Sequence, residues 1–250
     1  MVYFYICTSL IANEMIILKH IPNTITCLNL TCGALSIIST ASGDYKWGIL
    51  FIITAAILDF FDGFAARLLK CSSPIGKELD SLADVVSFGV APALMMYYYA
   101  ESFNTNFIEY ICLIIAPLSG LRLAKFNLDT RQTENFIGLA TPSCALLCGS
   151  LIYSTSIYPE LNNLFTKYTF IIPTIAVILS ILLVSEIPMF SFKFKDFKWQ
   201  NNATRFIFIA ITILLGIATI LLRYNWSIWV ALIFTSYILI NLICLPLHNR

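Results

Sequence analysis

Long apolar stretches alternate with short polar breaks along the whole chain. Each stretch is close to the ~20 residues that a helix needs to cross the hydrocarbon core of a bilayer. Backbone polar groups inside the hydrocarbon must be satisfied within their own segment, so each stretch is predicted to be a helix. The eight predicted spans cover about residues 23–42, 47–68, 79–100, 107–127, 139–158, 168–187, 204–222 and 226–246.

The composition agrees with this pattern. The chain is 59% hydrophobic and 12% charged, whereas a soluble domain carries about 25% charged residues. This difference excludes an ordinary soluble domain. We therefore predict an all-α integral membrane protein, a polytopic bundle of about eight transmembrane helices.

Residues 1–18 precede the first organised span. They lack the basic segment and the small-residue cleavage site that a secretory signal peptide carries. We therefore expect an interfacial or flexible lead-in over residues 1–18 and a single transmembrane domain over residues 19–250. Met15 is an alternative start to Met1.

Lysine and arginine residues predict the orientation, because they are enriched in cytoplasmic loops. With an even number of spans, twelve of the fifteen basic residues fall on the side of the two termini. Lys46, Lys167 and Arg223 fall on the other side. Both termini are therefore predicted to face the cytoplasm. The twelve are Lys19, Arg67, Lys70, Lys77, Arg122, Lys125, Arg131, Lys193, Lys195, Lys198, Arg205 and Arg250.

Four aspartates interrupt two of the most apolar segments, in the stretch DFFDGFAARLLKCSSPIGKELDSLAD. Asp59 and Asp62 are three residues apart and share one face of a helix, and Asp80 and Asp84 share a face at a spacing of four. The intervening CSSPIG predicts a tight connection between antiparallel neighbours. The two carboxylate pairs are therefore expected to face one another across a groove at the cytoplasmic end of the bundle.

Four like charges in one groove repel one another unless cations intervene. Mg²⁺ typically binds through one or two carboxylates together with substrate phosphates. Four carboxylates suit two divalent cations, Mg²⁺ or Mn²⁺ with Ca²⁺ as a third candidate, and such a pair can clamp a phosphate during displacement. The alternative is that the aspartates are helix-end charges that pair with Arg67, Lys70 and Lys77.

Small residues lie on the same face as the first two acids. Gly63 is four residues from Asp59, and Ala66 is four residues from Asp62. A bulky flat group could therefore approach the backbone beside the carboxylates. This pattern favours a ligand site over simple helix-end charges.

The pattern Asp59-x₂-Asp62-Gly63-x₂-Ala66-Arg67-x₈-Gly76-x₃-Asp80-x₃-Asp84 resembles the motif of the CDP-alcohol phosphatidyltransferases at every fixed position. The resemblance implies a six-helix catalytic core, here followed by two C-terminal helices. It also implies that the four aspartates hold two metal ions and that Asp84 is the general base. The cytidine of a CDP-linked lipid would lie beside Gly63 and Ala66, with Arg67 and Gly76 also at the donor site.

Flanking stretches are similar to those of the bacterial phosphatidylserine synthases in that family. They are HIPNTITCLNLTCGALSI, GKELDSLADVVSFGVAPA, GLRLAKFN, FIGLATPSCA and VSEIPMFSFK. One departure is Ala140, where those synthases commonly have proline, which would loosen the backbone before Thr141. The resemblance implies transfer of the phosphatidyl group of CDP-diacylglycerol to L-serine with release of CMP, and location in the bacterial cytoplasmic membrane. It also implies contact with membrane lipids, a homodimer and no nucleic-acid partner.

Two further groups of residues are candidates for substrate binding. Asn23 and Thr26 are expected to open the first helix, where they could bind the pyrophosphate or simply cap the helix. Arg122, Lys125 and Asn127 lie near the cytoplasmic end of the fourth span and could bind serine or a phosphate. Arg122 is deep enough to need a buried anionic partner, although the cations could also be orientation anchors.

Two alternative functions stay open. The first is the same chemistry with another acceptor, such as glycerol 3-phosphate or inositol. The second is a cation or proton transporter, since acids within membranes often mark ion pathways. A transporter is expected to have acids near the midplane in both halves of the chain, whereas here they lie at one end of one helix pair.

Overall fold

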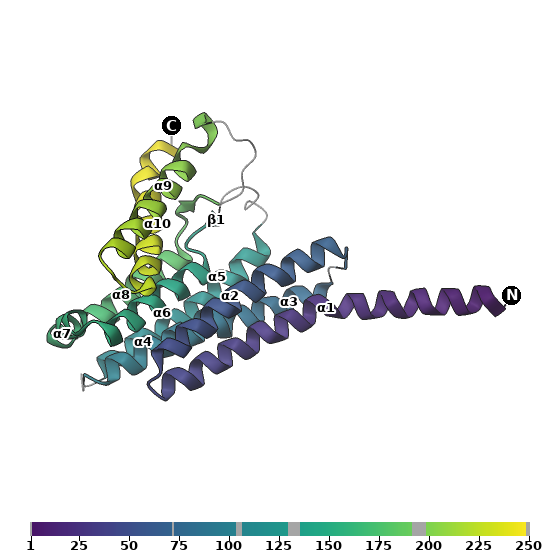
Figure 1. Ribbon diagram of the computed structural model, residues 1–250, viewed down its shortest axis with the longest axis horizontal. Coiled ribbons are helices and arrows are strands. Elements are labelled where there is room, and N and C mark those ends of the chain that lie inside the picture. The colour runs from purple at the N-terminus through teal and green to yellow at the C-terminus, as the bar shows by residue number, and fades with distance from the viewer. Residues whose placement is uncertain (1, 72, 104–106, 130–135, 192–198, 249–250) are drawn as a thin grey trace.

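The computed structural model describes residues 2–71, 73–103, 107–129, 136–191 and 199–248, and within them the chain is predominantly helical (Figure 1). The helices are α1 (Val2–Ala41), α2 (Tyr45–Leu68), α3 (Pro74–Asp84), η1 (Val85–Val90), α4 (Ala91–Glu101), η2 (Ile108–Ile114), α5 (Ile115–Leu128), α6 (Thr141–Ile157), α7 (Pro159–Lys167), α8 (Ile171–Val184), α9 (Trp199–Leu221) and α10 (Trp226–His248). Two short strands, β1 (Phe136–Ile137) and β2 (Pro188–Met189), pair in antiparallel fashion.

The polytopic all-α class is confirmed. Among the described residues, six helical segments are long and apolar enough to cross a membrane, and a seventh arises if α7 and α8, bent by 88°, form one broken span. Two of the eight predicted spans correspond to shorter helices, because α6 has 17 residues and α8 has 14. The six are His20–Ala41, Tyr45–Leu68, Pro74–Glu101, Ile108–Leu128, Asn202–Leu221 and Trp226–Ile243.

The first helix begins earlier than the sequence indicated. α1 continues through Pro22 back to Val2, and its N-terminal part projects beyond the bundle (Figure 1). A proline inside a helix removes one backbone donor but does not always end the helix. The interfacial or flexible lead-in over residues 1–18 stays a prediction, whereas the helix start expected near residue 23 is wrong.

The buried face of α1 is polar and its exposed face is apolar. Polar side chains at spacings of three, four and seven are almost fully buried, whereas apolar side chains between them are exposed. Helices in lipid associate through small and polar residues, because the lipid tails already solvate apolar groups. The buried residues are Thr26, Asn29, Ser36 and Thr40, and the exposed ones are Leu28, Leu35 and Ile38.

α2 and α3 are joined by a short turn that brings their acidic ends together. Lys70 adopts a left-handed conformation with φ 51°, and the Cys71 N–H bonds back to the Ala66 carbonyl at 3.1 Å. Ser73 then caps α3 by accepting the Gly76 N–H at 3.0 Å, and Pro74 occupies the start of the helix, where its missing N–H costs nothing. The connection predicted from CSSPIG is therefore present, and α1 packs against both helices.

A π-helical turn, η1, follows Asp84 directly and links α3 to α4 in one span. Its neighbours approach very closely: a Cβ on Gly33 of α1 would lie 2.4 Å from Ser87 Oγ, and one on Gly89 would lie 3.0 Å from Ser119 Cβ of α5. The span that carries Asp80 and Asp84 is therefore packed tightly between α1 and α5. Such wide turns occur often at functional sites.

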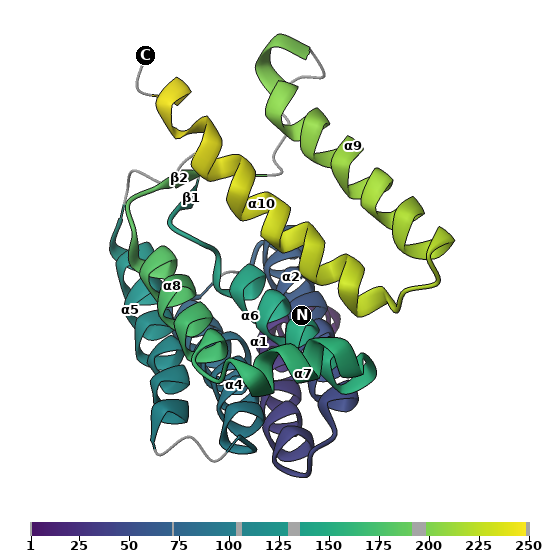
Figure 2. The same cartoon turned by 90° about the vertical axis from the view of Figure 1, so that its left-hand side faces the viewer.

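The C-terminal helices attach through α10. α10 packs on α6, and α9 packs on α10 (Figure 2). Buried Tyr237 donates its hydroxyl to the Phe190 carbonyl at 3.0 Å, and the Phe190 N–H donates to Asn241 Oδ1 at 2.9 Å. α10 therefore holds the segment around β2, which in turn pairs with β1.

Candidate active site

Three carboxylates converge where α1, α2 and α3 meet. Asp59 and Asp62 of α2 and Asp80 of α3 each offer an oxygen within 4.8 Å of the others. Asp62 is 5% exposed, and the other two are partly buried. The helical spacing and the tight turn predicted this meeting, and the structure shows it for these three of the four acids.

The helix-end alternative finds no support among the described residues. Among the residues that the structure describes, no ion pair joins these aspartates to Arg67, Lys70 or Lys77. Asp80 Oδ1 is buried and has no hydrogen-bond partner there. A buried carboxylate oxygen without a donor, beside two further carboxylates, fits a hard divalent cation.

Asp84 lies one helical turn beyond Asp80 and outside the group of three. Its side chain is 8% exposed, and the Asn29 amide donates to Asp84 Oδ1 at 3.4 Å. Asp84 is close enough to Asp59 and Asp80 to interact with their charges. The acids therefore differ in surroundings, with three in a cluster and one held by an amide from α1.

Thr26 orients one member of the cluster. Its hydroxyl donates to Asp62 Oδ2 at 2.8 Å and also lies 3.0 Å from the Pro22 carbonyl. Thr26 and Asn23 lie inside α1, so the expectation that they open the first helix is wrong. Their contacts are lateral, toward α2 and α3, because the helix continues through Pro22.

A cavity of about 200 Å³ opens beside the carboxylates. A Cβ on Gly63 would meet nothing closer than Arg67 Nη1 at 4.0 Å, so the missing side chain leaves open space there. A Cβ on Gly76 would lie 2.9 Å from Asn23 Oδ1, so this glycine lets α3 approach α1. The cavity is lined by Pro22, Asn23, Thr26, Asp62, Gly63, Ala66, Cys71, Ser73, Gly76, Lys77 and Asp80.

The predicted donor-site residues thus gather around one cavity, with one exception. Asn23, Thr26, Gly63, Ala66 and Gly76 line it, whereas Arg67 is exposed and lies outside its lining.

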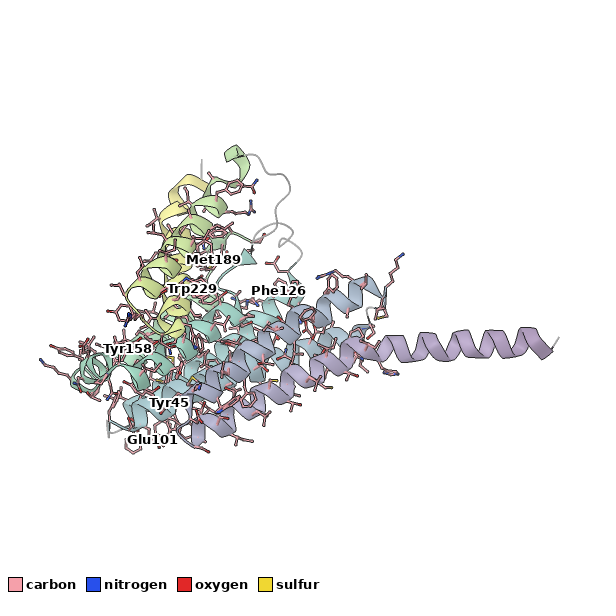
Figure 3. All side chains as sticks on the ribbon, viewed as in Figure 1. Tyr45, Glu101, Phe126, Tyr158, Met189 and Trp229 are labelled. Atoms are coloured by element: carbon pink, nitrogen blue, oxygen red, sulfur yellow. The ribbon has the colours of Figure 1, made fainter. Side chains whose placement is uncertain are left out.

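Arg122 of α5 lies near the acids but outside the lining of this cavity. Its side chain is 8% exposed, and its Nε has no hydrogen-bond partner among the described residues. The guanidinium lies 5.2 Å from the centre of the Phe126 ring, which Figure 3 labels, and is close enough to Asp59 and Asp84 to interact with their charges. A buried cation on α5 therefore lies near the carboxylates. The position of Arg122 within the fourth predicted span had indicated such a buried anionic partner.

Arg122 also lines a second, smaller cavity. Lys125 shares that lining and is itself exposed. The remaining lining comes from the end of α5, from β1 and from the segment that follows α8: Asp129, Ile137, Leu183, Val184, Ser185 and Glu186.

Asn127 has a different environment from Arg122 and Lys125. Its amide donates to Ser81 Oγ at 2.7 Å, and its carbonyl accepts from Lys77 Nζ at 3.2 Å. These bonds tie the end of α5 to α3. Arg131, which the sequence placed beside this group, lies outside the described residues.

Asn29 and Ser81 belong to the flanking stretches that the sequence analysis compared, but neither received a role at the site there. Asn29 is three residues after Thr26 and four before Gly33, so all three lie on one face of α1. That spacing was a usable signal for Asn29. Ser81 gave no comparable signal, because its partner Asn127 is 46 residues away.

Comparison with known proteins adds a family match. Residues 19–184 match the family model described as CDP-alcohol phosphatidyltransferase. The matched region runs to the end of α8 and contains Asp59, Asp62, Asp80 and Asp84, and α9 and α10 lie beyond it.

Curated relatives are similar over larger or smaller parts of the chain. The CDP-diacylglycerol–serine O-phosphatidyltransferase of Bacillus subtilis is 43% identical over 126 residues, which are 50% of this chain and 71% of the relative. The protein of that name from Helicobacter pylori is 33% identical over 193 residues, 76% of this chain and 78% of the relative. The archaetidylserine synthase of Methanothermobacter thermautotrophicus is 34% identical over 173 residues, 67% and 68% respectively.

Proposed function

The chain belongs to the CDP-alcohol phosphatidyltransferase family, and from that premise we propose that it transfers the phosphatidyl group of CDP-diacylglycerol to L-serine, giving phosphatidylserine and CMP. The observation that carries the proposal is the convergence of Asp59, Asp62 and Asp80 beside an open cavity in a multi-pass membrane protein. The names of the relatives support serine as the acceptor.

The acids are proposed to hold two divalent cations, Mg²⁺ or Mn²⁺, with Ca²⁺ as a third candidate. The all-oxygen donor set of Asp59, Asp62 and Asp80 and the unpartnered Asp80 Oδ1 support this assignment. Asp84 is proposed as the fourth ligand, one helical turn beyond Asp80. Bound cations would neutralise the charge of the pyrophosphate. Thr26 fixes the rotamer of Asp62 for this purpose.

The donor is proposed to enter the cavity beside α2 and α3. Gly63 and Ala66 leave room for the cytosine ring, Asn23 and Gly76 lie at the pyrophosphate, and Arg67 contributes positive charge at the rim. The acyl chains then stay in the bilayer, since the cavity lies at the end of transmembrane helices. The lining of the cavity supports this placement for four of the five residues.

Asp84 is proposed to act as the general base. It accepts the proton of the serine hydroxyl, whose oxygen forms a bond to the phosphorus that carries diacylglycerol. The bond between that phosphorus and the bridging oxygen breaks, and CMP leaves with the oxygen. The position of Asp84 supports this role, because its carboxylate lies beside the group of three acids and not within it. It is also close enough to Arg122 for their charges to interact.

The acceptor is proposed to bind on the Arg122 side. Arg122 and Lys125 supply positive charge for the serine carboxylate, and the buried unpartnered Nε of Arg122 supports this role. Asn127 contributes by holding α5 against α3 through Ser81.

The proposed setting is the bacterial cytoplasmic membrane, with the active site and both termini on the cytoplasmic side. The charge bias of the loops supports this orientation. We also propose a homodimer. Cross-linking in membranes tests the dimer, and labelling of single cysteines introduced at the two ends of the bundle tests the orientation.

The central experiment measures CMP release by purified protein with CDP-diacylglycerol and a panel of acceptors. L-serine is expected to stimulate release, glycerol 3-phosphate and inositol are not, and chelation of divalent cations should abolish it. Release with glycerol 3-phosphate but not with serine would overturn the proposed acceptor.

A further inference from the structure

Asn29 is fully buried beside Asp84, yet half of its side-chain amide has no partner among the described residues. Its Nδ2 lies 3.4 Å from Asp84 Oδ1, and its Oδ1 has no hydrogen-bond partner among the described residues. An ionised carboxylate can only accept hydrogen bonds, so the amide must turn its NH₂ group toward Asp84. The amide oxygen is then left free beside the base.

The position of Asn29 is fixed from both sides. Ser87 of η1 donates its hydroxyl to the backbone carbonyl of Asn29 at 3.0 Å. The close approach of Gly33 to Ser87 holds α1 against the span that carries Asp84. The backbone that carries the Asn29 side chain is therefore held in place beside Asp84. A buried amide oxygen without a donor is energetically costly. A ligand that brings a donor would remove this cost.

We infer that Asn29 Oδ1 receives the ammonium group of the acceptor, so that Asn29 selects a 2-amino alcohol such as L-serine. This inference rests on the proposed function. The serine hydroxyl goes to Asp84, and the carboxylate cannot donate, which leaves the ammonium as the remaining donor. Hydroxyl and ammonium are carried by neighbouring carbons, so they can reach two acceptors that lie side by side.

Arg122 completes the arrangement. Its guanidinium interacts with the charge of Asp84 from α5, whereas Asn29 approaches Asp84 from α1. The serine carboxylate on Arg122, the ammonium on Asn29 and the hydroxyl on Asp84 give three attachment points around one chiral carbon. Such a site distinguishes L-serine from an alcohol that lacks the amino group.

Two substitutions at Asn29 test this assignment. Asn29→Ala removes the amide and should raise the KM for L-serine by about 10- to 100-fold, the effect of losing a hydrogen bond to a charged group. The KM for CDP-diacylglycerol should stay within about twofold of the wild-type value. Asn29→Asp has nearly the same shape and keeps an oxygen, so its KM for serine should stay near wild type while kcat falls, because a second carboxylate then faces Asp84.

The ligand supplies a second control. 3-Hydroxypropanoate lacks only the amino group of serine, so its inhibition constant against serine should be the same for the wild type and Asn29→Ala. Thr40→Val is the matched protein control, since Thr40 is another buried residue of α1 whose hydroxyl oxygen has no partner among the described residues. It should leave both KM values unchanged.

Several results would overturn the inference. Equal weakening of serine and 3-hydroxypropanoate by Asn29→Ala would assign the residue to packing or to the cations instead. A KM for serine raised as much by Asn29→Asp as by Asn29→Ala would do the same. If the wild-type protein shows no serine-dependent CMP release, the proposed function fails and this assignment fails with it, whereas normal wild-type turnover with an unchanged KM in Asn29→Ala overturns Asn29 alone.

Discussion

The two sides of the carboxylate cluster are built in different ways. The proposed donor side consists of α2, the turn and the first part of α3, with Asn23 and Thr26 of α1 closing the cavity. The proposed acceptor side brings together Asn29 of α1, Asp84 at the end of α3 and Arg122 of α5, which are far apart along the chain. One side is local in sequence, and the other is assembled by packing.

In the proposed function, the local residues serve the chemistry that the family shares, and the residues assembled by packing select the acceptor. The local side carries the residues whose spacing matches a whole family of enzymes, except Asp84, the last position of that motif, which belongs to the assembled side. The assembled side depends on how α1 and α5 pack against η1, where Gly33 and Gly89 allow very close contact. Substitutions on the two sides should therefore have different kinetic signatures.

The largest effect is expected at the cluster that both sides share. Asp80→Asn should reduce CMP release by about 10³-fold or more, because loss of one charged ligand weakens the stabilisation of phosphate charge by several kcal/mol. Turnover is measured at saturating substrates and varied Mg²⁺. Asp44→Asn is the matched control, since Asp44 caps α2 at the opposite end by accepting the Trp47 N–H at 3.1 Å. Near-normal turnover of Asp80→Asn would remove Asp80 from the metal site.

Filling the donor cavity should affect one substrate only. Gly63→Leu should raise the KM for CDP-diacylglycerol at least about tenfold, because the side chain occupies the space beside the acids. The KM for serine should change little. Gly63→Ala is the control for the backbone, since its Cβ would meet only Arg67 Nη1 at 4.0 Å. If Gly63→Leu left the KM for the lipid unchanged, the cytidine would not bind beside Gly63.

Removing the buried cation Arg122 should affect the KM for serine instead of the KM for CDP-diacylglycerol. Arg122→Gln should raise the KM for serine about 10- to 100-fold, the effect of losing a charge-assisted hydrogen bond. The KM for CDP-diacylglycerol should stay almost constant. Lys125→Gln should have a smaller effect, because Lys125 is exposed and its charge is screened by solvent. A larger effect at Lys125 than at Arg122 would contradict this assignment of the carboxylate.

The smallest effect is expected at Ala140. Ala140 precedes α6 with φ −67° and ψ 136°, values that proline adopts without strain. Ala140→Pro should therefore leave both KM values unchanged and stabilise the fold by about 0.4–1 kcal/mol. Thermal unfolding in detergent provides the measurement. A loss of stability would show either that the fold needs the Ala140 N–H as a donor or that Leu139 cannot adopt the conformation that a following proline requires.

The sequence predicted the donor side well because its geometry is local. Asp59, Asp62 and Asp80 meet as their helical spacing and the CSSPIG turn indicated. The bonds from Thr26 to Asp62 and from Asn29 to Asp84 could not be derived in the same way, since they depend on how α1 is rotated against two other helices. The binding of serine or a phosphate by Asn127 stays a prediction, and its bond to Ser81, a contact between distant segments, could not be derived from spacing either.

The error at the start of α1 has a physical cause. Pro22 was taken as the boundary of the first helix, because proline often marks one. Thr24 and Thr26 bond instead to the carbonyls of His20 and Pro22 inside a continuous helix. The same helix shows a more general signal, since its small and polar residues face inward and its large apolar residues face outward.

The π-helical turn at Val85–Val90 sets a phase difference within one transmembrane span. The acids Asp80 and Asp84 lie before it, and the buried residues Met95, Met96 and Tyr99 lie after it. Removal of one residue from this turn would rotate the two halves by about 100° relative to each other. Either the acids would leave the cluster or the core residues would face the lipid, so the length of this segment is constrained even where its side chains are not.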